Sequence, residues 1–179
     1  MPEESSQAVN AAASPGLTAG RVSTVKRVVC AVIVVLIFAG DQITKRIVQQ
    51  SIPHDTEIPV ISGFFNITHT ENSGIAFSLF AGASSPWKLV LLIGVSLALL
   101  ITVIVIGLKS RDMSWGTGVG LAMILGGASS NLFDRIRFGQ VVDFLDVYYR
   151  SYHWPTFNVA DSAIVVGAGL LIIEILTSK

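Results

Sequence analysis

The stretch GQVVDFLDVYYRSYHWPTFNVAD, residues 139–161, determines how the rest of the chain is interpreted. Within it, Asp143 lies among apolar residues, and Asp161 stands where the last apolar run of the chain begins. A carboxylate at the edge of hydrocarbon is costly, so it needs a partner or a function. Two carboxylates brought within a few ångströms of each other share one proton at neutral pH, and such a pair can activate a water molecule. The stretch therefore suggests an enzyme.

The composition indicates a membrane protein. Of the 179 residues, 51% are hydrophobic and only 13% are charged, against about 25% charged in an ordinary soluble domain. The formal net charge is +0, so the sequence does not predict a nucleic-acid partner. Cys30 is the single cysteine, which excludes an internal disulfide and a zinc site built on cysteines.

Four apolar segments follow one another along the chain, at roughly residues 25–48, 89–108, 117–133 and 159–177. Each approaches the ~20 residues that a spanning helix needs. The third is short and rich in glycine, which permits close packing of helices. We expect an α-helical membrane protein with four transmembrane helices. Residues 25–179 then form one membrane domain, and residues 1–24, rich in Ala, Ser, Gly and Pro, form a disordered leader rather than a cleaved signal peptide.

The connections between these segments suggest where a site could form. Flanking Lys and Arg residues favour cytoplasmic termini, although six fall on each side of the membrane. The two long connections would then be extracytoplasmic. Residues 59–70 are rich in β-branched and aromatic residues between Pro and Gly, which predicts short strands and a small β-rich subdomain. Residues 72–80 are amphipathic and are expected to lie on the membrane surface and close over a site.

Two further groups of polar residues stand at the ends of apolar segments. Asp41 and Lys45 are four residues apart near the outer end of the first segment, either as an anchoring pair that reaches the interface or as the floor of a site. Asn131, Asp134 and Arg135 share one helix face at the end of the third. They form either an end cap with an Asp–Arg pair or a set of donors to the carbonyls of a bound peptide.

The sequence contains no motif typical of metal-dependent or serine-dependent catalysis. His54, His69 and His153 lack ligand spacing, and neither a metal-binding HExxH motif nor a GxSxG serine motif occurs. We therefore predict no metal and no cofactor. Asp143 and Asp161 remain, either as a water-activating pair of the kind found in aspartic proteases or as independent interface acids that cap a helix or bond a tyrosine.

Five linked motifs resemble bacterial lipoprotein signal peptidase (signal peptidase II) in order and spacing, over nearly everything from residue 25 to the C-terminus. They are Asp41-x-x-Thr44-Lys45, Asn72-x-Gly74-x-Ala76-Phe77, Gly126-Gly127-x-x-x-Asn131-x-x-Asp134-Arg135, Val142-Asp143-Phe144 and Phe157-Asn158-x-Ala160-Asp161. The resemblance implies a four-span aspartic endopeptidase of the bacterial inner membrane, with its active site on the extracytoplasmic side. It would cleave diacylglyceryl-modified prolipoproteins on the N-terminal side of the lipidated cysteine.

The resemblance also implies roles for individual residues. Asp143 and Asp161 match the catalytic pair. Polar residues of the substrate site match Asn72, Asn131, Arg135 and Asn158, and supporting positions match Asp41, Lys45, Gly127 and Asp134. The implied partners are lipidated prolipoproteins and membrane lipid, with the chain acting as a monomer. Two departures from the family pattern are Ile75, where a small residue is common, and Ser129-Ser130, where a bulkier residue and glycine are usual.

A small transporter is the alternative from a different class of protein. A small transporter also carries acids within the membrane, where they relay protons. Here the acids lie at the ends of the apolar segments on one side, and neither half of the chain resembles the other. The pattern therefore favours the peptidase over the transporter, and the number of polar residues on the outer side argues against a purely structural bundle.

Overall fold

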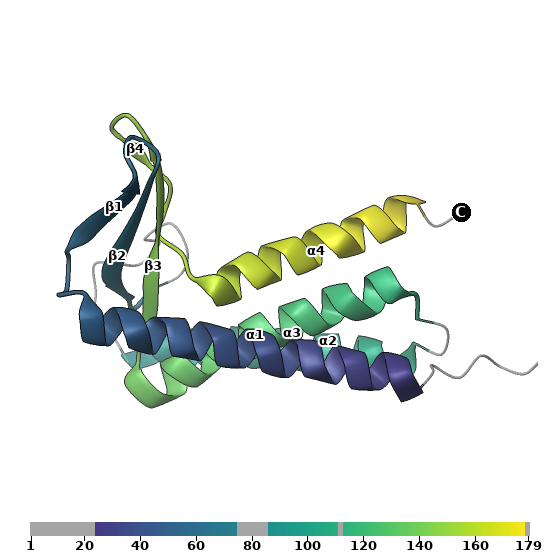
Figure 1. Cartoon of the computed structure of the whole chain (residues 1–179). Helices are drawn as coiled ribbons and strands as arrows, with labels where there is room; N and C mark the ends of the chain where they lie inside the picture. The colour runs from purple at the N-terminus through teal and green to yellow at the C-terminus, as the bar shows by residue number, and fades with distance from the viewer. Residues whose placement is uncertain (1–23, 75–85, 111–112, 178–179) are drawn as a thin grey trace, which may run out of the picture.

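The computed structural model describes residues 24–74, 86–110 and 113–177. They form four long helices and a small antiparallel sheet that stands across one end of the helices (Figure 1). The helices are α1 (Thr24–Ser51), α2 (Pro86–Lys109), α3 (Trp115–Phe138) and α4 (Val159–Thr177). The predicted leader lies outside the described residues except for Thr24, and so does most of the amphipathic segment at 72–80.

Three of the four predicted spans are confirmed as helices long and apolar enough to cross a membrane, namely α1, α2 and α4. Most of their large apolar side chains point away from the protein; Val90 and Leu108 of α2, for example, are exposed. Such exposure is expected where lipid replaces water. The fourth expected span, α3, is a long helix that does not meet this criterion, so its crossing stays a prediction.

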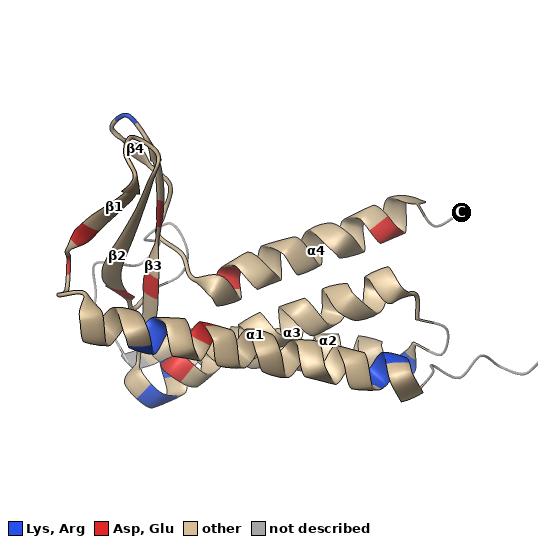
Figure 2. Ribbon diagram, viewed as in Figure 1, with Lys and Arg blue, Asp and Glu red and all other residues tan. Residues whose placement is uncertain are grey.

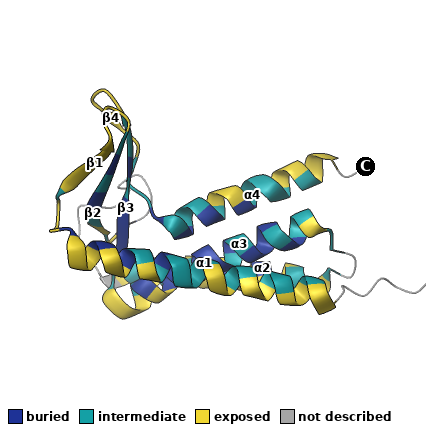
Figure 3. Cartoon of the chain, viewed as in Figure 1, coloured by how far each residue is buried: buried dark blue, intermediate teal, exposed yellow. Residues whose placement is uncertain are grey.

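Helix α3 differs in composition because it is the central helix. It packs against α1, α2 and α4, and its buried residues continue along most of its length (Figure 3). A Cβ atom on Gly127 would overlap the Ala160 carbonyl of α4, and one on Gly126 would lie 3.0 Å from the Val34 carbonyl of α1. Glycine is therefore required where α3 touches its neighbours. The low hydropathy of α3 reflects contact with protein rather than with lipid.

The sheet contains β1 (Glu57–Ile61), β2 (Phe65–Asn72), β3 (Val141–Tyr149) and β4 (Tyr152–His153), in the order β1-β2-β3-β4. The strands predicted within residues 59–70 are confirmed as β1 and β2. Strand β3 was not predicted, because the sequence analysis treated residues 139–158 as a connection. Its run of β-branched and aromatic residues is nevertheless typical of a strand.

Two local features place β3 against the helices. Gly139 adopts the left-handed conformation (φ 76°) at the end of α3, and its N–H donates to the Arg135 carbonyl, so the chain turns sharply from α3 into β3. Val142 and Phe144 of β3 then pack on Val48 and Ile52 at the end of α1. The carboxylate of Asp143, between those two apolar anchors, is thereby fixed close to the helix ends.

Candidate active site

The candidate site lies where the sheet meets the helix ends. Figure 2 shows acidic and basic positions gathered in this region, with long uncharged stretches along the helices beyond it. Asp143 comes from β3, Asp161 from the first turn of α4, Asn131 from α3 and Lys45 from α1. Four elements that are far apart in sequence therefore contribute polar side chains to one region.

Asp143 is a buried carboxyl held by two amides. It is only 2% exposed. Asn72 Nδ2 donates to its Oδ2 at 2.9 Å, and Asn158 Nδ2 donates to its Oδ1 at 2.8 Å. Burial raises the pKa of Asp143 to about 6; the charge of Asp161 acts in the same direction, and the two amide hydrogen bonds act against it. Asp143 is thus suited to hold a proton near neutral pH.

Asp161 takes part in the cap of α4. Its backbone N–H donates to Asn158 Oδ1 at 2.9 Å, and its Oδ2 accepts from the Asn158 N–H at 3.2 Å, which is a reciprocal capping box. Its other oxygen, Oδ1, accepts from Asn131 Nδ2 at 2.8 Å. The helix-capping alternative therefore holds for Asp161. Capping does not exclude a catalytic role, because the Asp161 carboxylate is only half-buried and Asn131 of α3 also orients it.

Asn158 and Asn131 connect the two aspartates. Asn158, which is 0% exposed, bonds Asp143 through its Nδ2 and Asp161 through its Oδ1 and its backbone. The same Nδ2 lies 3.2 Å from Asn131 Oδ1, and Asn131 in turn donates to Asp161. The structure thus brings Asp143 and Asp161 into one hydrogen-bonded network.

A second buried network supports the first. Lys45 Nζ lies 2.6 Å from both Asp41 Oδ2 and Asp134 Oδ2, and 2.8 Å from Asn131 Oδ1. Asp41 Oδ1 accepts from the Ala160 N–H at 2.8 Å, so α1 holds the N-terminus of α4. Lys45 is 3% exposed and does not reach the interface as the anchoring alternative required. These charges instead fix the helix that carries Asp161.

Two residues of this network were missed by the sequence analysis. Gln42 Nε2 donates to Asp134 Oδ1 at 2.7 Å and to Ser130 Oγ at 2.9 Å, and Ser130 Oγ donates to Asp41 Oδ2 at 2.7 Å. Ser130 had been noted only as a departure from the family pattern. The available signal was a polar residue, Gln42, beside Asp41 in an apolar helix.

Arg135 lies at the edge of the site. It is half-buried, and both Asp161 and Asp143 attract its guanidinium. Its Nη1 reaches the Asn131 carbonyl at 3.4 Å. Asp134, considered as its cap partner, pairs with Lys45. Within the described part of the chain, the bond to the Asn131 carbonyl is the one hydrogen bond of the guanidinium, so toward these residues several of its donor groups remain for a bound molecule.

Within residues 24–74, 86–110 and 113–177, no group of three or more His, Cys, Asp or Glu side chains is placed to hold a metal ion. The described polar side chains of the site are carboxylates, amides, the Ser130 hydroxyl, one lysine and one arginine.

Apolar membrane helices with two linked aspartates at one end, one on strand β3 and one on α4, fit a membrane-bound hydrolase. Residues 33–177 match the sequence model of the family described as signal peptidase (SPase) II, so the chain belongs to the signal peptidase II family, which consists of aspartic peptidases. The resemblance found in the five motifs is thereby confirmed. With its apolar helices, the chain is an integral membrane protein.

Similar proteins cover most of the chain. The lipoprotein signal peptidase of Solibacter usitatus (strain Ellin6076) is 46% identical over 144 residues, which are 80% of this chain and 88% of that relative. The lipoprotein signal peptidase of Serratia marcescens is 42% identical over 144 residues, covering 80% and 82%. A solved structure, described as a bacterial membrane enzyme determined by the in meso method at 1.9 Å resolution, is similar with a TM-score of 0.74 at 28% identity, covering 84% of this chain and 94% of that one.

Proposed function

We propose that this protein is an intramembrane aspartic endopeptidase that removes the signal peptide from diacylglyceryl-modified prolipoproteins, cutting N-terminal to the lipidated cysteine. Family membership supports the removal of signal peptides from prolipoproteins. The observation that carries the mechanism is the pair Asp143 and Asp161, both of which are hydrogen-bonded to Asn158. Such a pair supplies one proton acceptor and one proton donor, which peptide hydrolysis requires.

The proposed reaction uses the two carboxyls in different protonation states. The ionised carboxylate takes a proton from water as the water oxygen adds to the scissile carbonyl carbon. The protonated carboxyl donates a hydrogen bond to the carbonyl oxygen and stabilises its developing negative charge. The C–N bond then breaks as the carboxyl that took the water's proton gives it to the nitrogen, so that the amine of the lipidated cysteine leaves and the carboxylate is restored. Burial, which raises the pKa of Asp143 to about 6, lets Asp143 serve as the protonated partner.

Substrate contacts are assigned to the polar residues around the pair. Arg135 and Asn72 lie at its edge and are proposed to donate to peptide carbonyls. Asn72, Asn131 and Asn158 each bond an aspartate in the free enzyme, so contact with substrate would be an additional role for them. Residues 75–80, proposed as part of a lid, lie outside the described residues.

The proposed topology has α3 as a fourth span and the sheet on the extracytoplasmic side of the inner membrane. Helix α1 begins and α4 ends at the end of the bundle opposite the sheet (Figure 1). This arrangement fits both termini on one side and the site on the other. Two acyl chains, at about 0.8 kcal/mol per buried CH₂, keep the substrate in the bilayer, so the peptide reaches the site laterally. We propose that a monomer suffices.

Cleavage of a defined substrate tests this function. Purified protein in detergent is incubated with a diacylglyceryl-modified prolipoprotein, and the products are weighed by mass spectrometry. We expect one cut, which leaves the lipidated cysteine at the new N-terminus, and much slower cleavage of the unlipidated substrate. Folded protein that leaves the lipidated substrate intact would contradict the proposal, and equal rates for the two substrates would contradict lateral entry.

A further inference from the structure

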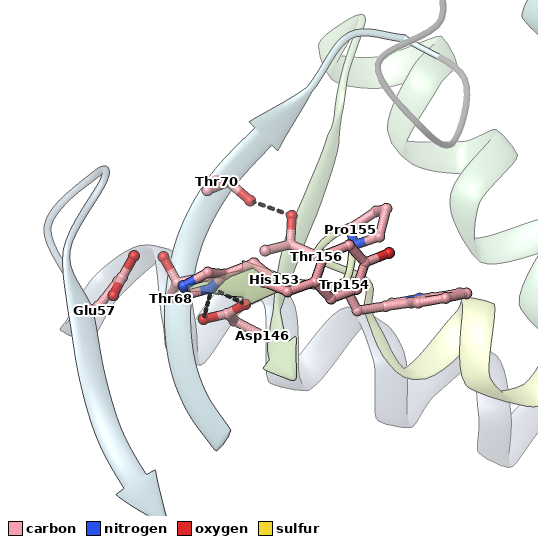
Figure 4. Close-up of a pocket in the computed structure, with 9 residues that line it drawn as sticks. Glu57, Thr68, Thr70, Asp146, His153, Trp154, Pro155 and Thr156 are labelled. Atoms are coloured by element: carbon pink, nitrogen blue, oxygen red, sulfur yellow. Dashed lines mark hydrogen bonds and ion pairs between the residues drawn. The ribbon is translucent and has the colours of Figure 1, made fainter. Parts of the chain in front are cut away.

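A second concave region lies on the sheet, beside the aspartate pair. It is a pocket of about 500 Å³. Figure 4 shows its labelled side chains coming from the strands and from the segment that leads into α4. The lining residues are Glu57 of β1, Thr68 and Thr70 of β2, Asp146 of β3, Tyr152 and His153 of β4, and Trp154, Pro155 and Thr156. The mechanism proposed above does not use this pocket.

The chemistry of the pocket is acidic and aromatic. Asp146 is 2% exposed, and its carboxylate is fixed by Asn66 Nδ2 at 2.9 Å and by His153 Nδ1 at 2.9 Å. Asn66 also reaches Glu57 Oε2 at 3.4 Å, so one amide positions both carboxylates. None of these described lining residues is a lysine or an arginine. The pocket therefore offers fixed negative charge without a built-in permanent cation.

The pocket is joined to the proposed active site through one hydroxyl. Thr70 Oγ1 donates to the Asp143 backbone carbonyl at 3.0 Å and lies 3.1 Å from Thr156 Oγ1, and both threonines line the pocket. Along β3, Asp146 is three residues beyond Asp143. At about 3.3 Å per residue the two positions are roughly 10 Å apart along the strand. An extended peptide cut at the aspartates would cover this distance with about three residues.

We propose that this pocket binds a basic side chain, lysine or arginine, of the mature lipoprotein, roughly two to four residues after the lipidated cysteine. The inference rests on the proposed function. The signal peptide is apolar and belongs among the helices, whereas the sheet lies beyond their ends, so the mature segment is the part that passes the pocket (Figure 1). Glu57, an exposed carboxylate, attracts the cationic head, the buried Asp146 adds to the negative field beneath it, and the rings of Tyr152 and Trp154 accommodate the stem.

Substrate series with matched enzyme variants test the inference. Lipidated prolipoproteins carry Lys, Gln or Glu at each of the second, third and fourth positions after the cysteine, and kcat/KM is measured by competition. The Glu57→Gln variant removes one pocket charge. Glu71→Gln, a partly exposed carboxylate on β2 outside the lining, is the matched control. We expect the native protein to prefer Lys over Glu at one position by about threefold to fivefold, as for a partly exposed charge pair.

Each outcome is decisive. A lysine preference that disappears in Glu57→Gln and persists in Glu71→Gln supports the pocket. Equal cleavage of all lipidated substrates overturns the inference and leaves the proposed function standing. A lysine preference that both variants weaken equally also overturns the inference, because the preference would then arise from the overall electrostatic field of the sheet rather than from the pocket. If folded protein cuts none of the lipidated substrates, the proposed function fails, and the inference fails with it.

Discussion

At the scale of single residues, the burial of Asp143 determines its acid–base behaviour. Its pKa of about 6 in the folded protein lies above the ordinary aspartate value of 3.8. The folded state therefore binds a proton more tightly than the unfolded chain between about pH 4 and pH 6. The contribution of Asp143 to the free energy of unfolding therefore falls as pH rises through this window, because the charged carboxylate is penalised above it.

This sign gives a prediction for Asp143→Asn. The variant cannot ionise, so it escapes a penalty that reaches about 3 kcal/mol in the native protein at neutral pH. We expect its stability relative to the native protein to be higher at pH 7.5 than at pH 4.5, as measured by thermal unfolding in detergent. Comparing the two pH values cancels the part of the substitution's effect that does not depend on pH. A difference that stays constant between them would show that the pKa of Asp143 is not raised.

Lys45 carries a second prediction at this scale. It is the shared partner of Asp41 and Asp134, both buried. Lys45→Met leaves two uncompensated buried carboxylates, and removing one partner of such a pair costs about 3–5 kcal/mol. The control is Arg46→Met, which removes an exposed charge at the next position. Thermal unfolding in detergent should show a large loss for the first and little change for the second; similar small effects would mean that the buried network contributes little.

At the scale of elements, the tight contact between α3 and α4 positions Asp161. Gly127 faces the carbonyl of Ala160, the residue before Asp161. The contact is so close that position 127 has no room for a Cβ atom. Asp41 holds the same turn through the Ala160 N–H. The first turn of α4 is therefore fixed from both α3 and α1, and a small displacement there would move a proposed catalytic group.

Gly127→Ala tests this contact. We expect a stability loss of about 1–3 kcal/mol, the usual cost of overpacking, with a further loss of peptidase activity at temperatures where the variant remains folded. Gly94→Ala in α2 is the matched control, since a Cβ atom there meets nothing within 4 Å. Unfolding and cleavage are measured on both variants. If the two variants unfold and cleave alike, the α3–α4 contact does not position Asp161.

Long apolar runs predicted the helices well, because hydrocarbon demands about 20 apolar residues per span. Strands β1 and β2 were also predicted, from their β-branched and aromatic residues. Strand β3 was missed, since Val141–Tyr149 contains acids whose burial only the fold explains. Residue types and the family motifs predicted the proximity of Asp143 and Asp161. The position of Gln42 in an apolar helix marked it as unusual, but its pairing with Ser130 could not be predicted, because a hydrogen bond between residues 88 positions apart leaves no local pattern.

At the scale of the whole molecule, the account requires that α3 cross the membrane. Ser110 lies between α2 and α3, and Ser151 lies between β3 and β4. The structure describes residues 110–151 except for 111–112, and within that described part α3 is the one long helix between the two serines. The two serines should be on opposite sides of the membrane if α3 spans it.

Single cysteines at these positions report the crossing. Ser110→Cys and Ser151→Cys are made separately in a Cys30→Ser background, and intact cells are treated with an impermeant thiol reagent. We expect Ser151→Cys to be labelled and Ser110→Cys to be labelled only after lysis. Labelling of both in intact cells would mean that α3 does not cross, and the reverse pattern would place the site on the cytoplasmic side.

The central claim is that Asp143 and Asp161 act together on one water molecule, and cleavage of a lipidated prolipoprotein by Asp143→Asn and Asp161→Asn tests it most directly. Asparagine keeps the size of each side chain but can neither accept the water's proton nor supply one of its own. We expect kcat/KM to fall at least about a hundredfold in each variant, while far-UV circular dichroism and detergent unfolding show folded protein. Native-like cleavage by either folded variant would contradict the claim.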